Sequence, residues 1–150
     1  MDSNFSRRRF LETSAVALGV SLLGCRSDET GVSSKAGAAS ATAQANPDGT
    51  FNLTGVAGVE KGKAMAFSFP DGQPGLFFVT QSGETGAVSA KCTHAGCTVE
   101  WQGEAKVPLR CPCHESLFSL EGKVISGPAK APLSRFSVTT NGNEAILKSA

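Results

Sequence analysis

The sequence predicts an all-β domain, and three observations support that prediction. Apolar residues occur in short alternating runs, such as Met65, Phe67 and Phe69, which is the period of a half-buried strand. Glycine, proline and aspartate separate these runs, and Asn141-Gly142-Asn143 is a strong hairpin signal. No window of about ten residues keeps a helical period. We therefore expect short strands joined by tight turns.

The expected strands follow one another from residue 65 to the end of the chain. The run 65–69 is the first, and the turn residues of 70–75 follow it. The others lie at 76–80, 98–101, 107–110, 117–120, 136–140 and 145–148. Trp101 ends one run, and we expect it in the core. Strands this short enclose a small core, which a metal site or a disulfide would help to stabilise.

Composition limits the classes of protein to consider. The chain has 150 residues, and a net charge of +1 with no basic face argues against nucleic-acid binding. Its longest apolar run is shorter than the roughly 18–20 residues that a membrane-spanning helix needs. Five cysteines accompany two histidines, and since five is odd, disulfides alone cannot account for all of them.

Residues 1–25 are typical of an export signal. Ser6-Arg7-Arg8-Arg9-Phe10-Leu11 resembles the twin-arginine pattern, and a short apolar stretch follows it. Leu22-Leu23-Gly24-Cys25 resembles a lipobox, in which Cys25 would be lipidated and would anchor the protein to a membrane. Two alternatives are cleavage elsewhere and an uncleaved signal that serves as the anchor.

Residues 26–50 are predicted to form a flexible tether. They are rich in serine, alanine, glycine and threonine, and Val32 is the only large aliphatic residue among them. Such a segment buries too little apolar surface to offset the entropy of ordering it. Asn46-Pro47-Asp48-Gly49 has the composition of a turn, so we expect the folded domain to span 51–150.

Two short blocks hold both histidines and four of the five cysteines. They are Cys92-Thr93-His94-Ala95-Gly96-Cys97 and Cys111-Pro112-Cys113-His114-Glu115-Ser116. Three interpretations compete: two disulfides with incidental histidines, a structural zinc site, and a binuclear iron–sulfur centre with mixed ligands. Structural zinc sites usually repeat cysteine pairs two to four residues apart, whereas each block here offers one cysteine–histidine pair and a further cysteine. This mixed spacing favours the iron–sulfur centre.

The two blocks closely resemble the C-T-H-x-G-C and C-P-C-H-x-S motifs of the Rieske family. The resemblance implies a small antiparallel β-sandwich with a cluster-binding subdomain on two loops, and one 2Fe-2S cluster as the cofactor. It also implies the ligands: Cys92 and Cys111 for one iron, His94 and His114 for the other.

Two further features of the family have counterparts here. The resemblance implies a disulfide between Cys97 and Cys113, which is typical of the branch in cytochrome bc and bf complexes and of arsenite oxidase small subunits. Gly127-Pro128-Ala129 is similar to the family's proline-containing loop, which covers the cluster. Such a disulfide persists only in an oxidising compartment, which agrees with the export signal.

Charge explains why histidine ligands suit an electron acceptor. Two ferric ions, two sulfides and two thiolates sum to zero, whereas four thiolates would leave a negative cluster, so neutral imidazoles favour electron uptake. Imidazole also has a second ring nitrogen that can hold or release a proton. A donor that loses both an electron and a proton, such as a quinol, matches this chemistry.

Four residues near the motifs are expected to tune the centre. Ser116 matches a family position whose hydroxyl bonds a bridging sulfide, whereas Phe118 replaces a tyrosine that bonds a ligand sulfur in high-potential members. Without the hydrogen bond from that tyrosine, the midpoint potential of the cluster should be lower. Glu115 stands where glycine is common, and it would either disfavour added negative charge or point harmlessly into solvent. Ala95 replaces a bulkier apolar residue, which leaves room for a different docking partner.

The sequence thus predicts an exported, membrane-anchored electron carrier rather than an enzyme that acts alone. Its expected role is the iron–sulfur subunit of a quinol-oxidising, cytochrome-bc-like complex, with a cytochrome b-type or other redox subunit, a quinol and a c-type cytochrome as partners. Alternatives are the small subunit of a periplasmic molybdenum oxidase and a free-standing lipoprotein shuttle. A zinc-stabilised binding module is the alternative from another class. Because the cluster uses both histidines, no base remains for a hydrolytic triad.

Overall fold

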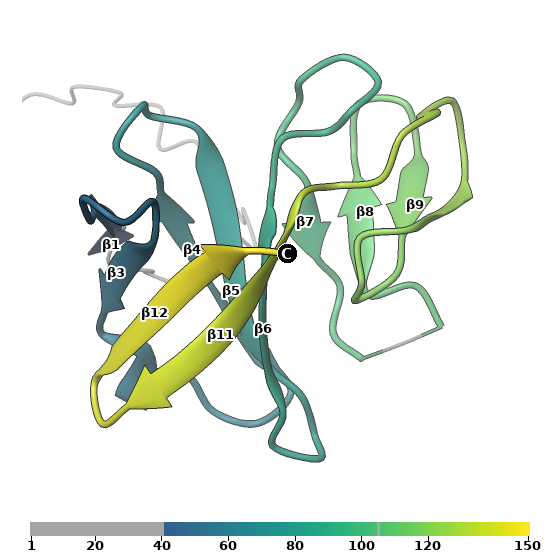
Figure 1. Ribbon diagram of the computed structural model, residues 1–150. Helices are drawn as coiled ribbons and strands as arrows, with labels where there is room; N and C mark the ends of the chain where they lie inside the picture. The colour runs from purple at the N-terminus through teal and green to yellow at the C-terminus, as the bar shows by residue number, and fades with distance from the viewer. Residues whose placement is uncertain (1–40, 105) are drawn as a thin grey trace, which may run out of the picture. The chain divides into compact units, whose positions relative to one another are not determined.

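The computed structural model describes residues 41–104 and 106–150, and within them the fold consists of two β-sheets (Figure 1). The main sheet has eight strands in the order β1-β4-β5-β6-β11-β12-β3-β2, and the small sheet has four, in the order β10-β9-β8-β7. The main-sheet strands are β1 (Ala41–Thr42), β2 (Gln44–Ala45), β3 (Phe51–Thr54), β4 (Lys63–Ser68), β5 (Pro74–Val79), β6 (Thr85–Ser89), β11 (Arg135–Asn141) and β12 (Glu144–Ser149). Those of the small sheet are β7 (Glu100–Trp101), β8 (Leu109–Cys111), β9 (Ser116–Phe118) and β10 (Val124–Ser126).

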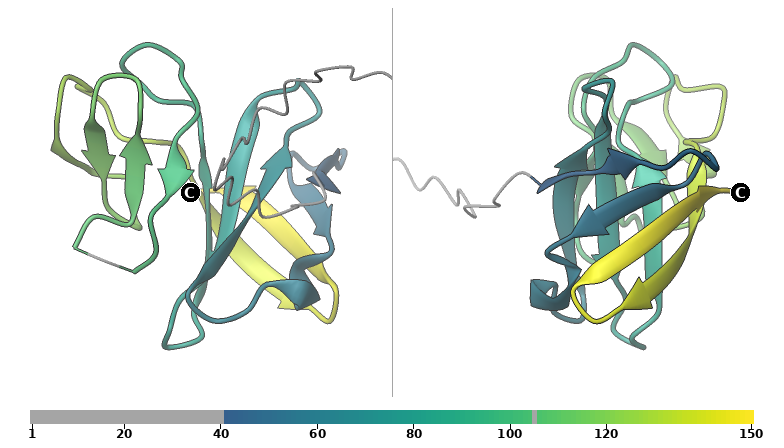
Figure 2. Two further views of the ribbon diagram at one scale, coloured as in Figure 1. Left: turned by 180° about the vertical axis from the view of Figure 1, so that it is seen from behind. Right: turned by 60° about the vertical axis from the view of Figure 1, so that its left-hand side comes forward.

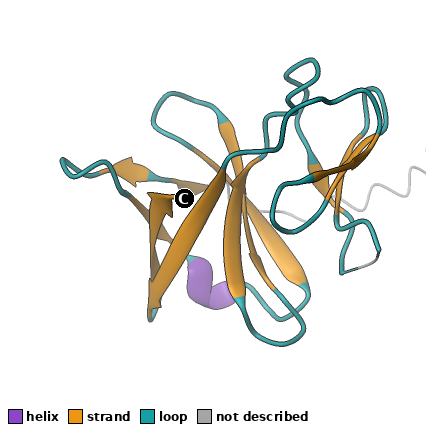
Figure 3. Ribbon diagram, turned by 45° about the vertical axis from the view of Figure 1, so that its right-hand side comes forward, coloured by secondary structure: helices purple, strands orange, loops and turns teal. Residues whose placement is uncertain are grey.

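The all-β prediction is confirmed. In the described residues one turn of 3-10 helix, η1 (Val56–Gly58), is the sole helical element, as Figure 3 shows. None of the described helices is long and apolar enough to cross a membrane. Each expected run contains a strand, and Gly142-Asn143 joins β11 to β12, which pair from Phe136–Ser149 to Asn141–Glu144.

Five of the described strands were not expected: β1, β2, β3, β6 and β10. Strand β6 has the sequence Thr-Gly-Ala-Val-Ser, and glycine and alanine are poor strand formers. Its Gly86 is required because a Cβ there would overlap the ring of Phe78 on the neighbouring strand. The ring of Phe78 leaves room only for a glycine at this position, so β6 lacks the apolar pattern that would have predicted a strand.

Strand β5 is buried on both faces and thereby joins two cores. Leu76 and Phe78 pack into a cluster with Leu109 and Phe118 of the small sheet, whereas Phe77 points into a second cluster within the main sheet. Successive strand residues face opposite sides of a sheet, so the unbroken run Leu76-Phe77-Phe78 serves both cores. Figure 2 shows the small sheet beside the main sheet from two further directions.

Trp101 is a core residue, as expected. Its ring stacks on that of Phe78 with centroids 5.3 Å apart and an interplanar angle of 16°. Its Nε1 donates a hydrogen bond to the Gly62 carbonyl oxygen at 3.3 Å. Because Trp101 lies on the small sheet and both partners lie in the main-sheet part, this side chain holds the two sheets together.

Strands β1 and β2 lie within residues 41–50, a stretch that the sequence predicts to be part of the tether. Strands β1 and β2 are the two edges of the main sheet and are separated in sequence by Ala43 alone, so the sheet curls until its edges meet there. Ala43 is 1% exposed, and its N–H donates to the Ser68 carbonyl at 2.8 Å. This segment was missed because it needs few apolar side chains: backbone hydrogen bonds and one buried alanine fix it. The expected signal, Cys25 and residues 26–40 of the tether lie outside the described residues.

The edge closure can be tested with adjacent substitutions. Ala43→Asp should lower the free energy of unfolding by about 3 kcal/mol, because it buries an unpaired carboxylate where the sheet edges meet. Thr42→Asp places the same charge on the neighbouring exposed residue and should cost about 0.5 kcal/mol or less. Denaturant unfolding followed by the fluorescence of Trp101 measures both. Equal stability of the two variants would contradict the closure.

Candidate iron–sulfur site

Two loops at one end of the small sheet carry the two cysteine–histidine blocks. The first, 92–97, is closed at its base by the Cys92 N–H, which donates to the Cys97 carbonyl at 2.8 Å. The second joins β8 to β9, whose last pair in register is Cys111 with Ser116. Both loops therefore leave paired backbone, which fixes where their side chains start.

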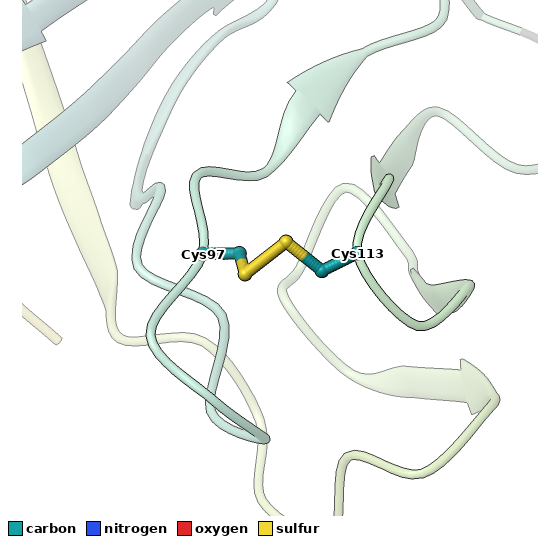
Figure 4. Close-up of a disulfide and its surroundings, with 2 residues drawn as sticks. All are labelled: Cys97 and Cys113. Carbon is teal, nitrogen blue, oxygen red and sulfur yellow. A yellow bond between two sulfur atoms is a disulfide. The ribbon is translucent and has the colours of Figure 1, made fainter.

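The Cys97–Cys113 disulfide joins the two loops (Figure 4). The two Cα atoms are 6.5 Å apart, and the bond links positions 16 residues apart in sequence. The structure thus confirms the expected pairing. The Sγ atoms of Cys97, Cys111 and Cys113 lie within 4.8 Å of one another. Because two of these sulfurs are bonded to each other, Cys111 alone in this group has a thiol that can bind iron.

Cys92 and Cys111 are the free cysteines of the described residues, and both are buried. Burial disfavours the thiolate of Cys92, but hydrogen bonds from the His94 backbone, the Cys111 side chain, the Ala95 backbone and the Ser116 side chain hold the pKa of Cys92 below its ordinary value. Burial and the neighbouring Cys92 sulfur raise the pKa of Cys111, against N–H groups of Cys113 and His114 that lower it. Backbone N–H groups thus point at both sulfurs, as thiolate ligands require.

The two histidine side chains lie side by side at the surface. The ring centroids of His94 and His114 are 4.7 Å apart, at an interplanar angle of 83°, and both residues are exposed. The site therefore combines two buried thiols with two exposed imidazoles. This donor set fits a binuclear cluster with sulfur ligands inside and nitrogen ligands facing solvent.

The segment after β10 contacts both loops. The Thr93 hydroxyl donates to the Ala131 carbonyl at 2.6 Å, and the Ala129 N–H donates to Ser116 Oγ at 3.1 Å. A Cβ at Gly127 would lie 2.6 Å from the Ser116 Cα, so the backbones touch there. This is the segment Gly127-Pro128-Ala129 that was expected to cover the cluster.

The residues expected to tune the centre take different positions. Ser116 and Phe118 are fully buried, and Phe118 belongs to the same apolar cluster as Cys92 and Cys111. Glu115 is exposed and forms an ion pair with Arg110, a partner that the sequence did not reveal. Ala95 is exposed in the first loop.

A cavity of about 390 Å³ borders the first loop. It is lined by residues 91–96 together with Gln73, Ser89 and Ser134. A larger cavity of about 510 Å³ shares those last three residues but is walled by Phe51, Phe69 and Phe136 of the main sheet and touches neither histidine. The chemistry of the site therefore lies at the smaller cavity.

A small sheet that presents paired cysteine–histidine loops beside a larger β-sheet defines an iron–sulfur protein, and comparison with known families names the class. A sequence model described as the Rieske [2Fe-2S] domain matches residues 51–137, so this chain belongs to the Rieske family and its cofactor is a Rieske 2Fe-2S cluster. Electron transfer is the activity associated with this family.

Curated relatives agree with this assignment. The chain is 37% identical over 92 residues to the "Cytochrome b6-f complex iron-sulfur subunit" of Chlorobaculum thiosulfatiphilum, covering 61% of this chain and 49% of that protein. It thus spans about half the length of the curated relatives it matches. The plasma membrane Rieske protein PetC3 of Synechocystis is 34% identical, with 57% of this chain and 85% of that one covered and a TM-score of 0.49. A chain from the oxygenase–ferredoxin complex of carbazole 1,9a-dioxygenase is 20% identical, with 66% and 92% covered and a TM-score of 0.56, and supports the fold.

The contact at Gly127 predicts a specific effect of adding one methyl group. Gly127 has φ +96°, and an alanine Cβ would press on Ser116 Cα and the Glu115 carbonyl oxygen. Gly72 has a similar φ of +79° but open space around it. Gly127→Ala should therefore lower the free energy of unfolding by about 2 kcal/mol more than Gly72→Ala does. It should also lower the iron content of the purified protein, because the covering segment must move. A cost equal to that of Gly72→Ala would contradict the close contact.

Proposed function

We propose that this protein is an exported, membrane-anchored electron carrier that serves as the iron–sulfur subunit of a quinol-oxidising, cytochrome-bc-like complex. The observation that carries the proposal is the pair of exposed histidine rings 4.7 Å apart. Only these two side chains of the proposed ligand set are exposed, so a partner that exchanges electrons with the site meets them first.

The proposed ligands are Cys92 and Cys111 for one iron and His94 and His114 for the other. When bound, the cluster takes up and releases one electron at a time. The buried cysteines keep the sulfur side of the site away from water, and hydrogen bonds from backbone N–H groups stabilise their negative charge. The imidazole nitrogen that does not bind iron can accept a hydrogen bond from a donor and take its proton. A quinol loses a proton and an electron together, which suits that arrangement.

The partners follow from the same chemistry. A cytochrome b-type subunit would supply the quinol site, and a c-type cytochrome would take the electron. The relatives named as subunits of the cytochrome b6-f complex support this role. A lipidated Cys25 or an uncleaved signal would hold the domain at the outer face of the membrane, on the predicted tether.

One observation favours a second candidate, the small subunit of a periplasmic molybdenum oxidase. Ala95 is exposed beside His94 and presents a single methyl group where members of quinol-oxidising complexes carry a bulkier apolar side chain. A tagged chain purified from its own membranes distinguishes the two roles. Co-purification of a cytochrome b subunit is the expected result, and a molybdopterin subunit in its place would contradict our proposal.

Cysteine substitutions test the ligand assignment. Cys92→Ser should remove the cluster, so that the purified protein loses iron, acid-labile sulfide and the electron paramagnetic resonance (EPR) signal of the reduced form. Cys25→Ser is the matched control and should keep all three, because we place Cys25 outside the domain. Full iron content in Cys92→Ser would show that this thiol is not a ligand.

Phe118 tests the proposed tuning of the cluster. We propose a midpoint potential below that of family members with tyrosine at this position, which suits a low-potential donor such as menaquinol. Phe118→Tyr should raise the potential by roughly 60 mV, the one-electron equivalent of a hydrogen bond of about 1.4 kcal/mol to a ligand sulfur. Phe136→Tyr, in the other core cluster, is the control and should leave the potential unchanged. A wild-type potential at the high end of the Rieske range would contradict the hypothesis.

A further inference from the structure

We propose that the Arg110–Glu115 ion pair stabilises, at the end of the second cluster loop, a backbone conformation that the glycine common at position 115 in the Rieske family adopts without strain. It stabilises the turn that carries His114 and cancels the charge of the carboxylate next to it. Both residues act as positioning residues. The proposal rests on the proposed ligand role of His114.

The backbone at Glu115 needs such support. Glu115 has φ +57°, and every other residue with positive φ among the described ones is a glycine. A side chain disfavours this left-handed conformation, so contacts made by Glu115 have to stabilise it.

The ion pair provides those contacts. The guanidinium of Arg110 donates two hydrogen bonds, from Nε to Oε2 at 2.8 Å and from Nη2 to Oε1 at 2.6 Å. Two parallel bonds between planar groups fix the orientation as well as the distance of the carboxylate.

The ion pair links the two ends of the second loop. Arg110 lies on β8, next to its last residue Cys111, and Glu115 lies just before Ser116, the first residue of β9. The pair therefore spans the base of the turn at 112–114. On its other face the backbone of Glu115 meets the covering segment, since a Cβ at Gly127 would lie 2.7 Å from the Glu115 carbonyl oxygen. The conformation of this one residue therefore affects the second loop and its cover together.

The charge of the pair matters because His114 is the adjacent residue. An unpaired carboxylate here would disfavour an added electron at the site, whereas the bidentate guanidinium offsets it. Arg110 also lies opposite Glu100 in the β7–β8 register. Loss of Arg110 would leave the carboxylate of Glu115 without its ion-pair partner, one residue away from His114.

The test uses the full-length, cluster-loaded protein and four variants: Arg110→Gln, Glu115→Gln, the double Gln variant and Glu115→Gly. EPR-monitored redox titration should show a lower midpoint potential in Arg110→Gln, a higher one in Glu115→Gln, and a value between them in the double variant. Both single shifts should shrink as salt concentration rises, because these side chains are partly exposed. Lys123→Gln, in the turn after β9, removes the same charge as Arg110→Gln and should shift the potential less.

Thermal unfolding tests the backbone part of the proposal. Glu115→Gln keeps a side chain at positive φ without the ion pair, and should unfold at a lower temperature than both the wild type and Glu115→Gly. If Glu115→Gln is as stable as Glu115→Gly, or if Arg110→Gln leaves the potential of an intact cluster unchanged, the proposal is overturned. A wild-type protein without a cluster would instead contradict the assignment of the ligands. The comparison of unfolding temperatures would still decide whether the ion pair stabilises the backbone at Glu115.

Discussion

The Cys97–Cys113 disulfide is the constraint on which the site depends. The two loops it joins are otherwise linked through β7, β8 and the chain between them, which includes the exposed residues Gln102, Glu104 and Lys106. The disulfide fixes their separation directly, and in this arrangement the rings of His94 and His114 come to lie 4.7 Å apart. The hydrogen bonds of Thr93 and Ser116 to the segment 129–131 then hold both loops from the outside. A site built around a disulfide requires an oxidising compartment, which makes the proposed export part of the chemistry.

The division between buried sulfur and exposed nitrogen explains how one small domain can both keep and exchange charge. Cys92 and Cys111 belong to the same apolar cluster as Leu109 and Phe118, so the thiol side of the site is part of the core that joins the two sheets. Stability of the fold and stability of the ligand set are therefore coupled. The histidines have no such role in packing, since both are exposed. They are free to contact a partner without disturbing the core.

The sequence was most informative where a pattern repeats or a spacing is rare. Short apolar runs located β4, β5, β11 and β12. The cysteine–histidine blocks located both loops, and their resemblance to the Rieske motifs implied the disulfide. Strand β6 was not predicted because its Gly86 makes room for the ring of Phe78, a residue on the neighbouring strand β5. The partner role of Arg110 was not predicted for a related reason: Arg110 meets Glu115 across the turn between β8 and β9, where Glu115 has a positive φ. Contacts made by an unusual backbone conformation leave no periodic trace in a sequence.

The closure of the main sheet at Ala43 bears on how an anchored carrier can move. The chain before residue 41 joins the domain at strand β1 of the main sheet, whereas the first cluster loop lies between β6 of the main sheet and β7 of the small sheet, and the second joins β8 to β9. The two sheets are held together by the stacked rings of Phe78 and Trp101 and by a shared apolar core. Under the proposed anchoring, a pull on the chain before residue 41 would reach the main sheet first and would pass to the small sheet through packed side chains and through the backbone that joins β6 to the first loop. Because the first loop is also bonded to the main sheet at its base, where the Ala90 N–H donates to the Pro74 carbonyl at 2.8 Å, the two sheets and the cluster loops would turn as one body.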